Sequence, residues 1–186
     1  MAIKLPFDEI NTFIQTVIAE YARLETEERI RRTQKDVDDY ILELYAMGIY
    51  DNSVMLGLPF EALDGEYLLL TVIDGKTVND RIALHIRNND DGRLKNLIDS
   101  ELHKAYEAGK SDYASYQMAD GHTVTKTWNT WLDDKVRDTH DYLEAMTVLA
   151  DEEFYTYDGD HAKHPGDFAL AQNNVNCRCF LTYSLG

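Results

Sequence analysis

The stretch "NNVNCRCFLTY", Asn173–Tyr183, contains the only two cysteines of the chain, Cys177 and Cys179. The segment is predicted to be a strand, and residues two apart on a strand point to the same face of a sheet. The pair is then a metal site, a nucleophile, a disulfide or part of a packed core. The disulfide is the weakest interpretation, because residues i and i+2 lie at the upper limit of disulfide geometry and two cysteines make no framework. We therefore expect reduced thiols.

A zinc site at these cysteines needs two further ligands, which four histidines offer: His122, His140, His161 and His164. The Cys-x-Cys spacing is shorter than the usual spacing of paired zinc ligands, and the sequence holds no second pair. The preferred prediction is that the thiols pack in the core and that no cofactor is bound. Zinc held by Cys177, Cys179 and His140 stays open as the alternative.

A nucleophilic site is a second alternative, with His140 as the base and Asp138 or Asp141 to orient it. His140 follows Arg137 by three residues, so both lie on one face of a short helix. A histidine in this setting is more often a hydrogen-bonded core or interface residue than a catalyst. The prediction is therefore that the protein has no catalytic residues.

The acidic loop "YDGDHAKHPGD" contains Asp158, Asp160 and Asp167, which are candidate ligands for a hard cation. The loop lacks the full ligand series of a calcium loop, so a turn with solvated carboxylates is the preferred interpretation. No nucleotide-binding glycine loop, GxSxG or HExxH motif occurs in the sequence.

The composition indicates one main domain and argues against general nucleic-acid binding. The 186 residues carry 34 acidic and 18 basic side chains, a net charge of -16, so the surface as a whole repels phosphate. A local basic patch is the exception: Arg29, Arg31, Arg32 and Lys35. No apolar run is long enough for a membrane span, and "MAIKLPFDEINTF" lacks the features of a secretory signal, so we expect a cytoplasmic protein without membrane contact.

Apolar spacing predicts two N-terminal amphipathic helices, as a hairpin or as one long bent helix. The first begins near Asp8, which follows Pro6, and the second runs from about Thr26 to a C-cap at Gly48. The first apolar stripe comprises Ile10, Phe13, Ile14, Val17, Ile18 and Tyr21. The second comprises Ile30, Val37, Tyr40, Ile41, Leu44 and Tyr45.

The rest of the chain is predicted to be a small α+β domain with short strands and a hairpin. "YLLLTVIDGKT" is interpreted as a buried strand or connector followed by a turn, Thr77 as a helix cap, and "GRLKNLIDSELHKAYEAG" as a helix that ends at Gly109. "HTVTKTW" is typical of a strand, and Asp158-Gly159 of a hairpin turn. The expected domains are 1–50 (helical), 51–74 (connector) and 75–186 (main domain).

Several motifs then occur in a fixed order: "KTW", Arg-x-x-His-x-x-Leu, a Phe, "YDGD", "HPGD" and "VNCRC". Their order and spacing over Lys126–Tyr183 resemble the C-terminal domain of the Mu F-like phage head-morphogenesis family, also called minor head proteins. With "IDGKTVNDRI" and the helix after it, the resemblance extends over 73–183. The motif residues are Trp128, Arg137, His140, Phe154, Gly159, Pro165, Gly166, Asp167, Asn176, Cys177, Arg178 and Cys179.

The resemblance implies a structural, non-enzymatic minor head (minor capsid) protein of a phage or prophage, acting in head morphogenesis and capsid assembly near the portal. Implied partners are the portal protein, the major capsid protein and further copies of the chain, and the implied location is the virion, with the host cytoplasm during assembly. Trp128, His140 and Phe154 are expected to pack with the cysteines. Asn176 or Arg178 is expected to hydrogen-bond the 165–167 loop. The alternatives are a zinc-stabilised interaction module and a phage-borne enzyme or toxin-like effector.

Overall fold

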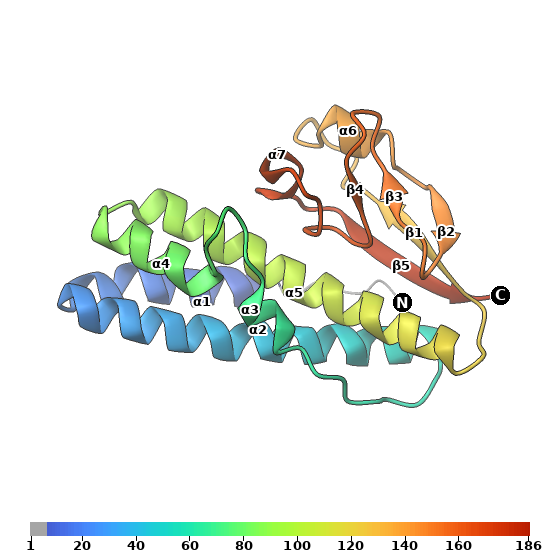
Figure 1. Ribbon diagram of the computed structural model, residues 1–186, viewed down its shortest axis with the longest axis horizontal. Coiled ribbons are helices and arrows are strands. Elements are labelled where there is room, and N and C mark those ends of the chain that lie inside the picture. The colour runs from blue at the N-terminus through green and yellow to red at the C-terminus, as the bar shows by residue number, and fades with distance from the viewer. Residues whose placement is uncertain (1–6) are drawn as a thin grey trace.

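A layer of long helices carries a small antiparallel sheet along one side (Figure 1). The computed structural model describes residues 7–186. The helices are α1 (Phe7–Ala19), the 3-10 turn η1 (Tyr21–Arg23), α2 (Thr26–Leu56), α3 (Tyr67–Leu70), α4 (Val78–Arg87), α5 (Asp91–Ala119), α6 (Asp138–Asp141) and α7 (Ala171–Asn174). The strands are β1 (Val124–Asn129), β2 (Thr147–Leu149), β3 (Phe154–Tyr155), β4 (His161–Ala162) and β5 (Phe180–Leu185). The predicted α+β architecture, with helices first, is confirmed.

The N-terminal helices bury the apolar stripes that the sequence predicts. Ile10, Ile14 and Val17 of α1 are at most 3% exposed, and α1 packs on α5. The turn η1 separates α1 from α2, so the chain forms two helices and not one bent helix. The first helix begins at Phe7; Pro6, in the predicted start signal, lies outside the described residues.

Two glycines that the sequence suggested as helix ends lie instead where α2 and α5 cross. A Cβ at Gly48 would lie 2.1 Å from the carbonyl oxygen of Tyr106, and a Cβ at Gly109 would lie 2.0 Å from that of Tyr45. The predicted ends at Gly48 and Gly109 are therefore wrong. Both helices continue through these positions, because a residue without a side chain is what lets the two backbones touch. Helix α2 ends at Gly57, whose φ of 67° is the left-handed C-cap conformation.

The segment between α2 and α4 forms a short helix and a turn. Of the two interpretations of "YLLLTVIDGKT", the strand is wrong, since Tyr67–Leu70 is helical, and the segment is a connector. The predicted turn is present at Asp74 and Gly75, both with positive φ. Thr77 caps α4 as predicted, and its hydroxyl and the carboxylate of Asp80 form a reciprocal capping box.

The sheet has the order β2-β1-β5, with both pairs antiparallel. The central strand β1 places Trp128 opposite Leu181 and Lys126 opposite Tyr183. A separate hairpin of β3 and β4 turns at Gly159, which has a φ of 87°, as its Asp-Gly motif predicts. Strand β5 lies against the helical layer, contacting α2 and α5 (Figure 1).

The basic patch predicted on α2 is neutralised by acidic partners within the chain. Arg29 pairs with Asp91, Arg31 and Arg32 with Glu28, and Lys35 with Asp39. The patch therefore offers no surplus positive charge for binding phosphate. Among the described helices, none has the length and apolar character required to cross a bilayer.

Candidate functional site

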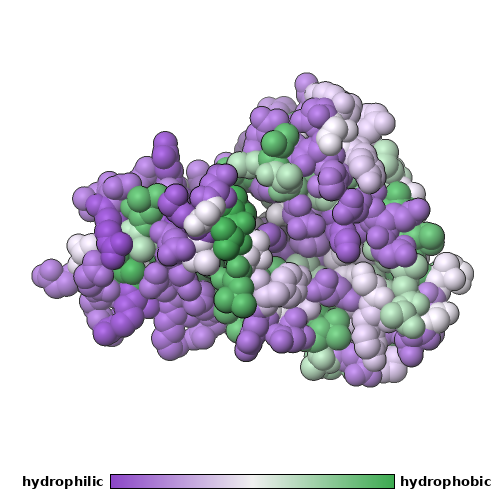
Figure 2. Space-filling model, in the orientation of Figure 1, coloured by the Kyte–Doolittle hydropathy of each residue, from purple (hydrophilic) through white to green (hydrophobic). Residues whose placement is uncertain are grey.

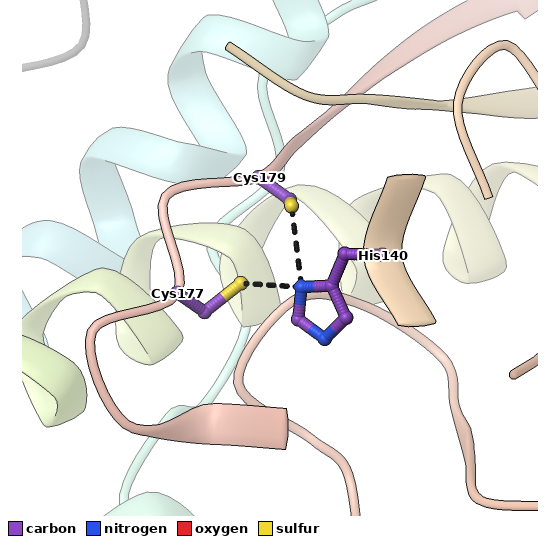
Figure 3. Close-up of side chains that lie close together, drawn as sticks. All are labelled: His140, Cys177 and Cys179. Atoms are coloured by element: carbon purple, nitrogen blue, oxygen red, sulfur yellow. Dashed lines mark hydrogen bonds between the residues drawn. The ribbon is translucent and has the colours of Figure 1, made fainter. Parts of the chain in front are cut away.

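The two cysteines and His140 converge inside the small sheet domain (Figure 3). The Nδ1 atom of His140 lies 3.4 Å from the sulfur of Cys179 and 3.6 Å from that of Cys177. Helix α6 presents the histidine, and the loop between α7 and β5 presents the cysteines. The cysteines therefore precede the strand on which the sequence placed them, yet both sulfurs turn toward one nitrogen. All three side chains are buried.

An aromatic shell fixes the imidazole ring of His140. Phe168 stacks on it with the ring centres 5.2 Å apart, and Trp128 meets it edge-on at 5.7 Å. Phe154 also packs on Trp128, with the ring centres 5.1 Å apart. The expected grouping of Trp128, His140 and Phe154 around the cysteines is thus present, and the histidine is only 1% exposed.

A second histidine, His103 of α5, reaches the same site from the helical layer. Its Nε2 lies 2.8 Å from the carbonyl oxygen of Cys179, and the ring also contacts the Cys177 side chain. This residue is not among the site residues predicted from the sequence. Its place on α5, directly after Leu102 of the predicted apolar stripe, was the available signal, but only the packing of α5 on the loop brings it to the cysteines.

The surroundings make the two thiols unequal. A hydrogen bond from Cys179 holds the pKa of Cys177 well below its usual range; burial opposes the shift, while His103 and His140 add to it. The pKa of Cys179 is raised in turn, because its thiol is engaged by Cys177 and because it is buried. Burial lowers the pKa of His103, but its contacts with Cys177, together with Glu107 and the Cys179 carbonyl, more than offset this, so that pKa is raised. The surroundings therefore favour a thiolate at Cys177 and a thiol at Cys179.

The three other candidate histidines lie elsewhere. His122 is exposed, His161 pairs with Glu153 at 2.9 Å, and the Nδ1 of buried His164 lies 3.0 Å from the carbonyl oxygen of Pro165. Among the described residues, none of them joins His140 and the cysteines.

The nucleophile alternative lacks its orienting acid. The Nε2 atom of His140 is buried without a hydrogen-bond partner in the described structure, so neither Asp138 nor Asp141 holds the ring. A catalytic Cys-His arrangement uses such a third group to orient the base. The predicted orienting role of Asp138 or Asp141 is therefore wrong.

The sequence-based prediction that Asn176 or Arg178 hydrogen-bonds the 165–167 loop is wrong. Arg178 forms a bidentate ion pair with Asp133. Asn176 is exposed and has a left-handed backbone conformation with a φ of 56°. The neighbouring Asn174 makes the connection instead, since its side chain bonds both the N–H and the carbonyl of Phe168. Arg137 donates to the carbonyl oxygen of Val175 and ties α6 to the same loop.

The acidic loop is a structural turn. Asp160 accepts hydrogen bonds from the backbone N–H groups of His161, Ala169 and Leu170 and from the side chain of Asn173, at 2.8–3.1 Å. Asp158 accepts from the hydroxyl of Thr156. Both Asp160 oxygens are occupied by donors, so this carboxylate has no lone pair directed at a cation.

The profile of the Phage Mu protein F like family matches residues 68–182, a span that includes His103, His140 and both cysteines. The chain belongs to the Phage Mu protein F like family. The resemblance seen in the sequence motifs is thereby confirmed. The motif cluster around Trp128 and His140 is consequently part of the Mu F-like domain, as is the whole of α5.

Two curated proteins share parts of this Mu F-like chain. One is the NAD(+)--arginine ADP-ribosyltransferase EFV of Enterococcus faecalis, 30% identical over 128 residues, which is 69% of this chain and 24% of that protein. The other is the minor head protein GP7 of Bacillus phage SPP1, 33% identical over 84 residues, 45% of this chain and 27% of that protein. The matches thus span about a quarter of each relative. No solved structure shows a significant match.

The Mu F-like domain also has a groove that the sequence did not indicate. It has a volume of about 580 Å³ and lies between the helical layer and the loop before β5. Arg81 and Lys104 line one wall, and Phe168 and Val175 line the other. Beside it, a hydrophobic band crosses the surface over α3 and the loop that follows (Figure 2), where Leu70 and Val72 are 74% and 58% exposed.

Proposed function

We propose that this protein is a structural, non-enzymatic minor head protein of a phage or prophage that acts in head assembly near the portal. The observation that carries the proposal is membership of the Phage Mu protein F like family, together with the similarity to the minor head protein GP7 of phage SPP1. The protein then resides in the virion, and in the host cytoplasm during assembly. The shared region is about a quarter of GP7, so the proposal concerns the part that this domain plays.

The proposed partners are the portal protein and the major capsid protein. The amphipathic character of α1 and α2 suggests a docking element, but their apolar faces are buried within the chain itself, as Ile14 and Val37 illustrate at 0% exposure. Partners therefore meet the outer surface of the helices or the sheet domain. Self-association of the chain stays part of the proposal.

An enzyme or toxin-like effector is the second candidate, because one relative is named as an arginine ADP-ribosyltransferase. The chain covers 24% of that protein, and the His140 ring beside the two cysteines has no orienting carboxylate. Incubation of the purified chain with NAD+ and arginine is expected to give no ADP-ribosyl transfer. Transfer that depends on the chain would establish the effector instead.

The test of the head role is co-expression of the tagged chain with the portal and major capsid proteins of the same phage or prophage. We expect the portal protein to co-purify in a complex of fixed stoichiometry. Electron microscopy of assembled heads should place the chain at the portal vertex. A chain that captures neither protein and is absent from purified heads would contradict the proposal.

Two leucines serve as matched surface probes in that experiment. Leu70, beside the helical layer, and Leu132, in the sheet domain, are each 74% exposed. Leu70→Asn and Leu132→Asn make the same change, and asparagine tolerates the positive φ of Leu132. Neither variant removes a buried contact. Loss of portal binding in only one of them therefore shows whether the helical layer or the sheet domain binds the portal protein.

A further inference from the structure

We propose that Cys177, Cys179 and His140 Nδ1 form a structural zinc site that fastens the C-terminal strand to the rest of the sheet domain. The proposal goes beyond the head-assembly role and does not depend on it. It replaces the sequence-based preference for cysteines that only pack in the core.

The two distances from the histidine nitrogen to the sulfurs are those of a tetrahedral zinc site. Zinc binds sulfur at about 2.3 Å and histidine nitrogen at about 2.0–2.1 Å, so tetrahedral angles put nitrogen and sulfur about 3.5 Å apart. The His140 Nδ1 atom lies 3.4 Å from the Cys179 sulfur and 3.6 Å from the Cys177 sulfur. The three donor atoms all lie within 4.8 Å of one another, so one ion reaches them together.

Hydrogen bonds alone do not explain why both sulfurs lie so close to the Nδ1 atom of His140. An imidazole Nδ1 has either one lone pair or one N–H, so it makes a single good hydrogen bond, whereas two sulfurs approach it at similar distances. A metal ion bonds all three donors at once. Two thiolates and a divalent cation also cancel in charge, which removes the cost of burying the ion or the thiolates separately.

The donor set selects the metal. Thiolate ligands favour zinc, copper(I) or iron–sulfur clusters, and a mixed set of cysteine and histidine in a tetrahedral arrangement is typical of zinc. A small pocket of about 10 Å³, lined in part by His140 and Cys179, opens from the surface beside Trp131 and Arg178. About 10–15 Å³ of such space is the minimum for one water molecule. On this proposal a water there is the fourth ligand, and the opening is the entry path.

Neighbouring residues hold the donors in place. Phe168 and Trp128 fix the plane of the His140 ring, and the indole N–H of Trp128 lies near the Cys179 sulfur without making a regular hydrogen bond. His103 bonds the Cys179 carbonyl and contacts Cys177. Such outer contacts orient metal ligands and are worth roughly 10- to 100-fold in metal affinity.

The site has a structural purpose in this fold. Its ligands are 37 and 39 residues apart in the sequence and join α6 to the start of β5. Beyond β1 and β5, the sheet domain has only strands of two or three residues. A small domain with so little regular structure gains stability from a metal that links its loops.

The test uses the full chain, purified under reducing conditions without chelator. We expect one zinc ion per chain by native and elemental mass spectrometry. Cobalt(II) added to the stripped chain should give the thiolate-to-metal absorption of a tetrahedral site. Cys177→Ser and Cys179→Ser should each lose the retained zinc, and His103→Gln should weaken cobalt binding roughly 10- to 100-fold. His122→Gln, at an exposed histidine outside the cluster, is the matched control and should keep the full ion.

A measurement without any variant covers the case in which the serine variants fail to fold. X-ray absorption at the zinc edge of the unmodified chain should show two sulfur neighbours at about 2.3 Å and nitrogen or oxygen neighbours at about 2.0–2.1 Å. The proposal is overturned by a reduced chain that takes up neither zinc nor cobalt. It is equally overturned by a bound ion without sulfur neighbours, or by an ion that the double cysteine variant retains.

Discussion

The ammonium group of Lys110 lies 2.5 Å from the carbonyl oxygen of Leu181, joining α5 to the edge strand of the sheet. Glu107, one turn earlier on α5, accepts the Leu181 N–H at 3.0 Å and pairs with Lys110 at 2.9 Å. Both charged side chains are at most 1% exposed. Helix α5 therefore satisfies the backbone groups on the open side of β5, which another strand would otherwise bond.

Lys110→Met is expected to destabilise the protein by about 3–5 kcal/mol, because it leaves Glu107 as an unpaired buried charge and the Leu181 carbonyl without a donor. Urea denaturation measures the change. The control is Lys35→Met, which removes an exposed pair with Asp39 and should leave the midpoint where it was. Equal effects of the two variants would show that the buried pair does not fasten β5.

Gly48→Ala and Gly109→Ala should each cost at least about 3 kcal/mol, at or above the upper end of the range for overpacked sites. In both cases the new methyl group meets a backbone carbonyl oxygen of the opposite helix, which no side-chain rotation can relieve. Thermal unfolding followed by circular dichroism measures the loss.

The control for these variants is Gly92→Ala, in the first turn of α5, where the nearest atom to an added Cβ is a side-chain oxygen at 3.7 Å. Alanine is the better helix former, so this variant is expected to be neutral or slightly stabilising. Tolerance of alanine at Gly48 would mean that α2 and α5 do not cross as closely as the structure has them.

Asp160→Asn should cost about 1.5–3 kcal/mol near neutral pH, because the carboxylate accepts three backbone N–H groups and the Asn173 amide. Burial alone would raise the pKa of Asp160, but these hydrogen bonds outweigh it and the pKa is lowered. The unfolded value is about 3.9, so the stabilisation is complete above about pH 5 and is lost as the pH falls through the lower folded pKa.

Measuring the unfolding free energy as the pH is lowered tests this role of the Asp160 carboxylate. The unfolding free energy of the unmodified chain should fall more steeply with acidification than that of Asp160→Asn, which no longer binds this proton. Asp74→Asn removes one charge at an exposed turn and should keep the steep limb. Parallel curves for the unmodified chain and Asp160→Asn would refute the role given to this carboxylate.

Asn176→Ala is expected to cost about 1 kcal/mol, and Asn176→Gly to be neutral, because the residue has a left-handed φ of 56° that alanine tolerates poorly and glycine adopts freely. This replaces the sequence-based expectation of buried hydrogen bonds for Asn176, whose side chain is exposed. Comparison of the two melting curves separates the effect of the backbone conformation from that of the side-chain amide. A glycine variant as unstable as the alanine variant would restore a role for the amide.

The sequence by itself determined the local elements and the family. The apolar spacing of Ile10, Ile14 and Val17 predicted α1, Thr77 predicted the capped start of α4, and Asp158-Gly159 predicted the hairpin turn. These features depend on residues within a few positions of each other, whose period and backbone preference are legible in the sequence. The ordered motifs from Trp128 to Cys179 indicated the Mu F-like family for the same reason.

Only the tertiary structure decided what these elements do together. Gly48 and Gly109 have the local character of helix ends, and only the close crossing of α2 and α5 shows why both helices continue through them. Likewise His103 of α5 and His140 of α6 both reach the cysteines in the loop before β5. Contacts between residues far apart in the chain depend on how whole elements pack, and local periodicity carries no information about that packing.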